Sequence, residues 1–130
     1  MRNPEAATDL IHRIGGALVR DPDVVELPWE ALALVVTVEP GVVSTSGYAY
    51  DERRRPIAFT PSRGSGLVEL FRELQEATSD PGGRRWAACL VQVRRATGKM
   101  TMQYEYDDVD RWKVTPDNLD TMRAGLCPAE

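Results

Sequence analysis

The sequence predicts a single α+β domain in which amphipathic helices pack on one face of a mainly antiparallel, five-stranded sheet. Two observations carry this prediction. Short apolar or alternating runs are joined by turn signals, which favours an antiparallel meander, and three helical patterns each show a single apolar stripe that must be buried against the sheet. The expected order is α-β-β-β-α-β-β-α. The length of 130 residues suits one domain spanning residues 1–130.

The first helix is predicted over residues 4–18. Asn3 can cap it, and Pro4 suits its first position. Gly15 and Gly16 each lower helix stability by about 1 kcal/mol relative to Ala, so the second half must depend on packing or end early. A boundary follows at Asp21-Pro22. The apolar residues recur at steps of three and four: Ala7, Leu10, Ile11, Ile14, Ala17 and Leu18.

Three strands are expected next. Residues 31–38 are apolar and β-branched, and the turn signal Glu39-Pro40-Gly41 leads into a second run over residues 42–51, so the two form an antiparallel hairpin. Residues 53–55, all arginine, occupy the next connection. A short third strand is predicted over Ile57–Phe59.

The central helix is the most regular of the chain. Its apolar stripe runs from Leu67 to Ala77, with charged residues on the opposite face, and Asp80-Pro81-Gly82-Gly83 ends it. Ser62 or Ser65 is expected to cap its start.

A second hairpin follows, with a strand over Trp86–Arg95, a turn at Thr97-Gly98 and a strand that begins at Lys99. Its second strand alternates strictly, and we expect its apolar face to pack in the core. That face carries Met100, Met102, Tyr104 and Tyr106. A last short helix is predicted, with Thr115 as the cap and Pro116 at its first position.

The exit of the last strand is the most acidic part of the chain. From Thr101 to Asp110 there are four acidic residues and no Lys or Arg, a local charge of about −4 that equals the net charge of the whole chain. We predict a partner-binding surface here, with the tryptophan as an aromatic anchor. The predicted binding residues are Glu105, Asp107, Asp108, Asp110 and Trp112.

Other interpretations of the acidic cluster stay open. Asp107 or Asp108 could cap backbone amides in an exposed turn. The three aspartates could also serve acid–base catalysis if one were buried in a cleft, or bind a metal ion, although D-D-x-D lacks the spacing of a calcium loop. The protein could equally have a non-catalytic housekeeping or interaction role.

The remaining residues favour no enzyme class, and we expect no metal and no cofactor. His12 is the only histidine, and Cys89 and Cys127 lack the spacing of metal ligands, so we expect free thiols in the cytoplasm. The segment 61–66, PSRGSG, lacks the signatures of phosphate-binding loops. Twenty acidic against sixteen basic residues argue against direct nucleic-acid binding, and no apolar run is long enough to span a membrane. Arginines 53–55, 84–85 and 94–95 are expected in solvated turns and at strand ends.

One family shares much of this pattern. The chain from Leu67 through Asp108 resembles the YezG-like immunity proteins, antitoxins of bacterial polymorphic and LXG-type toxins, which also run from a helix to a tryptophan-led strand, a T-G-K turn and a strand ending in Y-D-D. Residues 27–34, LPWEALAL, look like that family's entry into the first strand. After Asp108 the segment RWKVTPDNL departs from the family pattern. The motif maps onto Trp86, Gly98, Tyr104, Tyr106, Asp107 and Asp108.

The resemblance implies a small cytoplasmic α+β protein that binds and neutralises a cognate toxin, often one with a nuclease domain. It implies no catalysis. The partner would be the toxin protein itself, with no nucleic acid and no membrane in direct contact.

Overall fold

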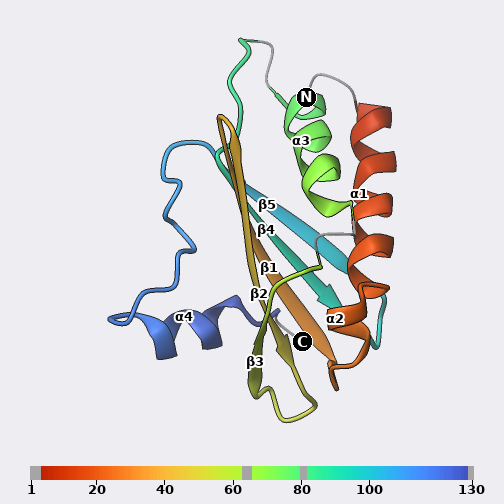
Figure 1. Ribbon diagram of the computed structural model, residues 1–130, viewed down its shortest axis with the longest axis vertical. Coiled ribbons are helices and arrows are strands. Elements are labelled where there is room, and N and C mark those ends of the chain that lie inside the picture. Colours follow the sequence, from red (N-terminus) through yellow and green to blue (C-terminus); the bar gives the residue numbers. More distant parts are fainter. Residues whose placement is uncertain (1–3, 63–65, 80–81, 129–130) are drawn as a thin grey trace.

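Five strands form one antiparallel sheet with β1 at its centre. The structure is a computed structural model that describes residues 4–62, 66–79 and 82–128. The sheet has the order β3-β2-β1-β4-β5, which confirms the predicted α+β class and the order of its elements (Figure 1). The strands are β1 (Ala31–Glu39), β2 (Val42–Tyr50), β3 (Pro56–Phe59), β4 (Ala88–Arg94) and β5 (Met100–Glu105).

The helices α1 (Pro4–Val19) and α3 (Leu67–Ala77) cover one face of the sheet (Figure 1). Their apolar stripes form the main core together with the even-numbered residues of β1. Helix α1 continues through both of its glycines. A Cβ atom at Gly15 would lie 3.1 Å from the Sδ atom of Met100, so this glycine allows the helix to approach β5 closely. The predicted cap Asn3 lies outside the described residues.

A one-turn helix, α2 (Pro22–Val25), was not predicted. Asp21 caps it, with Oδ1 accepting from the Asp23 N–H at 2.8 Å. Its Oδ2 accepts from the Ser62 N–H at 2.8 Å, which ties α2 to the segment before α3. Ser62 therefore does not cap α3, whose N-cap is Gly66 at φ +78°. Ser65 and Asp80-Pro81 lie outside the described residues.

Trp86 lies in the main core, and Tyr104 packs against it. Strand β4 begins two residues later than predicted, and Trp86 precedes it as a fully buried side chain. Its Nε1–H donates to Thr78 Oγ1 at 2.7 Å, and its ring stacks on Tyr104 with centroids 5.5 Å apart. Tyr106 packs at the edge of the same core, so the expected core packing of both tyrosines is confirmed.

The helix α4 (Leu119–Leu126) lies against the opposite face of the sheet (Figure 1). The prediction that this helix starts at Pro116 is wrong, because Asn118 holds the preceding segment as a turn. Asn118 Oδ1 accepts from the Thr115 N–H at 2.7 Å, while its Nδ2 donates to the Lys113 carbonyl at 3.0 Å. Leu126 and Trp112 both belong to a smaller second core on this face.

Candidate functional site

The acidic turn, residues 105–110, is organised by Glu105. Its Oε2 accepts from the backbone N–H groups of Asp107 at 3.0 Å and Asp108 at 3.3 Å, and its Oε1 accepts from Arg111 Nη1 at 3.1 Å. These bonds, the Asp107 amide first, hold the pKa of the Glu105 carboxyl below its usual value. Glu105 thus fixes the backbone from which the three aspartates project.

The three aspartates of the turn are exposed to solvent. Asp107 forms an ion pair with Arg84, whose guanidinium lies 5.1 Å from the centroid of the Tyr106 ring. Asp108 Oδ1 accepts from the Asp110 N–H at 3.1 Å, so Asp108 caps a backbone amide, as one interpretation of the cluster expected. Arg84 and Arg111 come from outside the acidic decad and offset part of its charge, which remains negative.

Trp112 is buried, with only 7% of its surface exposed. Its indole belongs to the smaller core on the second face of the sheet, which also contains Ala33 of β1 and Ala88 of β4. The Arg111 guanidinium lies 4.8 Å from the ring centroid. Trp112 therefore attaches the acidic turn to the sheet, while the predicted role as a partner anchor stays a prediction.

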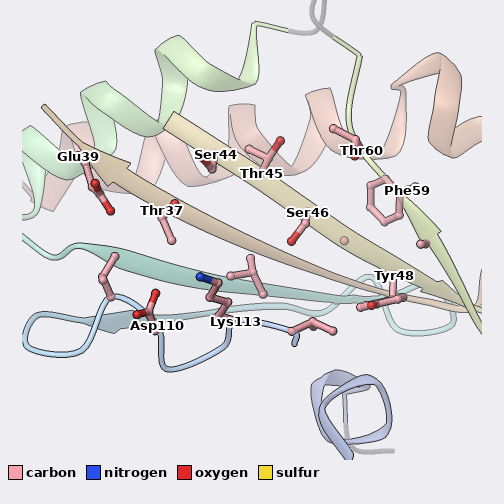
Figure 2. A pocket seen from close by; sticks show the side chains of 15 residues that line it. Thr37, Glu39, Ser44, Thr45, Ser46, Tyr48, Phe59, Thr60, Asp110 and Lys113 are labelled. Carbon is pink, nitrogen blue, oxygen red and sulfur yellow. The ribbon is translucent and has the colours of Figure 1, made fainter. Parts of the chain in front are cut away.

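A groove of about 690 Å³ lies between the chain after the acidic turn and the uncovered part of the second sheet face (Figure 2). One wall comes from the three strands β1, β2 and β3, and the other from residues 109–114. Thr37 pairs with Ser44 and Val35 with Ser46, so alternate residues of the two strands share this face. The polar side chains that line the groove are Thr37, Glu39, Ser44, Thr45, Ser46, Tyr48, Thr60, Asp110 and Lys113.

The groove combines hydroxyl groups with charges of both signs. Glu39 on the strand wall and Asp110 on the loop wall both line it, and Figure 2 shows the Lys113 ammonium directed into it beside Asp110. Carboxylates only accept hydrogen bonds, whereas hydroxyls both donate and accept. This arrangement suits the binding of a polar, donor-rich group.

Sequence reasoning identified Asp110 but missed the rest of the groove. A period-two signal was present in Ser44, Ser46 and Tyr48, which place three hydroxyls on one face of β2. The opposing wall had no comparable signal, because the position of residues 109–114 over the sheet depends on the burial of Trp112.

The other candidate residues lie apart from this groove. His12 is exposed on α1, which packs on the other face of the sheet. Cys89 is buried in the main core and Cys127 packs on the second core, so the sheet separates the two free thiols. Burial raises the pKa of the Cys89 thiol well above its usual value, which keeps it protonated and unreactive.

The arginine clusters have intramolecular contacts. In the β2–β3 connection, Asp51 Oδ1 accepts from the N–H groups of Arg53 at 2.9 Å and Arg55 at 3.0 Å, so a compact turn holds these arginines. Arg95 stacks on the Trp29 ring at 4.1 Å from its centroid. These contacts agree with the expectation of turns and strand ends.

The comparisons with known proteins add no relative: neither the scan against protein-family models nor the search of curated proteins found a match to this chain. Within residues 4–62, 66–79 and 82–128, no three His, Cys, Asp or Glu side chains are grouped so that they could hold a metal ion. No helix in the same ranges has the length and apolarity needed to cross a membrane.

Proposed function

We propose that this protein is an immunity protein, which binds a cognate bacterial toxin in the cytoplasm and covers the toxin's working surface. The observation that carries the proposal is the acidic turn, which exposes three carboxylates on a hydrogen-bonded backbone beside a polar groove. The resemblance to the YezG-like proteins supplies the class of partner. A toxin with a basic substrate groove, such as a nuclease domain, would match this surface in charge.

The turn is preorganised for such a contact. Glu105 accepts from two backbone amides and from Arg111, and Trp112 attaches the segment to the sheet. Little conformational entropy is then lost on binding, which favours affinity. The exposure of the aspartates also favours binding over acid–base catalysis, which draws on buried carboxyl groups in clefts.

The contact must extend beyond the turn. A stable protein–protein interface buries about 800 Å² on each partner, which is roughly a tenth of the 7549 Å² accessible surface of this chain. The acidic turn and the adjoining groove together are well placed to form its centre. In this proposal the negative carboxylates steer the toxin and raise the association rate, while contacts in the groove limit dissociation.

Co-expression tests the proposal. The toxin encoded beside this gene should arrest growth when expressed alone, and the wild-type chain should restore growth and co-purify with the toxin. An inactive version of the toxin should co-purify equally well, which controls for indirect effects of growth. If the chain neither restores growth nor co-purifies with the toxin, the proposed function is wrong.

A further inference from the structure

We propose that the groove receives an arginine side chain of the bound partner, with its guanidinium between Glu39 and Asp110. The inference rests on the proposed function in one respect: the arginine belongs to the toxin. The identity of the occupant follows from the charges and hydroxyl groups that line the groove.

The first support is a surplus of negative charge. Glu39 lies at the end of β1 and Asp110 in the acidic turn, and both are exposed where they line the groove (Figure 2). Among the described residues, no side chain forms an ion pair with either carboxylate or donates a hydrogen bond to it. Asp108 adds a third negative charge nearby, whereas Lys113 supplies one positive charge in the groove. A cationic occupant is therefore favoured.

The second support is the wall of hydroxyl groups. Thr37, Ser44, Ser46 and Tyr48 project from β1 and β2 into the groove, and no described protein group hydrogen-bonds their hydroxyls. A guanidinium has five N–H donors in a planar fork and no acceptor, so it can bind carboxylates and hydroxyl oxygens at once. An ammonium is a compact point charge that matches such a row less well. The groove volume of about 690 Å³ also accommodates an arginine together with flanking backbone.

Lys113 gives the inference a test with a definite sign. Its ammonium shares the groove, so it opposes a cationic occupant and would attract an anionic one. Replacing it with the uncharged Met should therefore tighten the binding of arginine and weaken the binding of glutamate. The interaction between two unit charges about 6 Å apart in water changes Kd about threefold, so this is the size of effect expected for Lys113→Met.

The experiment titrates the full chain with capped tripeptides, Gly-Arg-Gly and Gly-Glu-Gly, and follows backbone amides by NMR. We expect Gly-Arg-Gly to shift the amides of Ser46 and Asp110 and to bind about threefold more tightly to Lys113→Met. Asp110→Asn should weaken it about threefold, and Glu52→Gln, in the turn that follows the far end of β2, should leave it unchanged. The inference would be overturned if Gly-Glu-Gly bound more tightly than Gly-Arg-Gly, or if Gly-Arg-Gly shifted no amide at the groove. It would also be overturned if Gly-Arg-Gly bound Lys113→Met more weakly than it binds the wild-type chain.

A second measurement separates this inference from the proposed function. Ser46 is exposed, so Ser46→Trp should fill the groove while the chain still folds, as its NMR spectrum would show. We expect this variant to lose protection against the toxin. If it protects as well as the wild type, the arginine site is wrong and the immunity function stands. If the wild-type chain fails to protect while the tripeptide results hold, the immunity function is wrong and the arginine site stands.

Discussion

Replacing Trp112 with Ala tests whether this side chain supports the fold. Its indole is 7% exposed and is the largest side chain of the second core, whose other buried members are Ala31, Ala33, Val35, Tyr50, Ala88, Leu90 and Leu126. Removing a buried Trp costs about 3–5 kcal/mol. We expect the lower end, about 3 kcal/mol, because the Arg111 side of the ring borders exposed chain.

Urea unfolding followed by circular dichroism measures this loss. With a dependence on urea of about 2 kcal/mol per molar, a loss of about 3 kcal/mol lowers the midpoint by roughly 1.5 M. Leu119→Ala is the matched control, since Leu119 is 39% exposed at the start of α4 and should change stability by less than about 0.5 kcal/mol. An equally small change for Trp112→Ala would refute the packing role and leave the predicted role of Trp112 as a partner anchor.

Two further predictions concern stability. Folding lowers the pKa of the Glu105 carboxyl below its usual value of 4.5. Its ionised form therefore stabilises the native state at pH values above 4.5, and this stabilisation disappears as the pH falls through the lower native pKa. Glu105→Gln should thus unfold at a lower urea concentration than the wild type at pH 7, and the difference between the two proteins should be smaller at pH 3; an equal difference at both pH values contradicts this. Gly47→Ala should destabilise the fold by about 1–3 kcal/mol, because the added Cβ would lie 2.7 Å from Phe59 Cζ and 2.8 Å from the Ala33 carbonyl oxygen. The control Gly125→Ala places its Cβ within 4 Å of no other atom and should leave the melting temperature unchanged or raise it. An unchanged melting temperature for Gly47→Ala would contradict this prediction.

The fold could be predicted from the sequence where local signals agreed. The apolar stripe of Leu67–Ala77 matched the observed helix at both ends, because periodicity and burial coincide there. The turn at Pro40-Gly41 also set the first hairpin, with Gly41 at φ +77°. Such agreement of pattern and turn chemistry specifies local structure without knowledge of distant contacts.

The errors arose where particular side-chain hydrogen bonds and ion pairs, near or far in sequence, decide the structure. Thr115-Pro116 is a good local start for a helix, but the side chain of Asn118 hydrogen-bonds the segment into a turn. The acidic turn illustrates the same limit, since Arg84 is 23 residues from Asp107 in sequence and yet pairs with it. The charge counted within a short stretch of sequence therefore overstates the negative electrostatic field around this turn.

The candidate site was predicted in part for the same reason. Glu105, Asp107, Asp108 and Asp110 were recognisable as a charged strand exit, but the groove beside them combines β1, β2 and β3 with a loop some 50 residues further along the chain. Only the folded sheet brings these segments together.

The association rate with the co-purifying toxin tests the central claim most directly. Stopped-flow mixing would compare the wild-type chain with Asp108→Lys/Asp110→Lys, and with Glu26→Lys/Glu52→Lys as a control of equal charge change at the other end of the sheet. If the acidic turn steers the toxin, its reversal should slow association about tenfold at low salt and flatten the salt dependence, while the control stays closer to the wild type. Equal rates for all three proteins at low salt would contradict a toxin-binding role for the acidic turn.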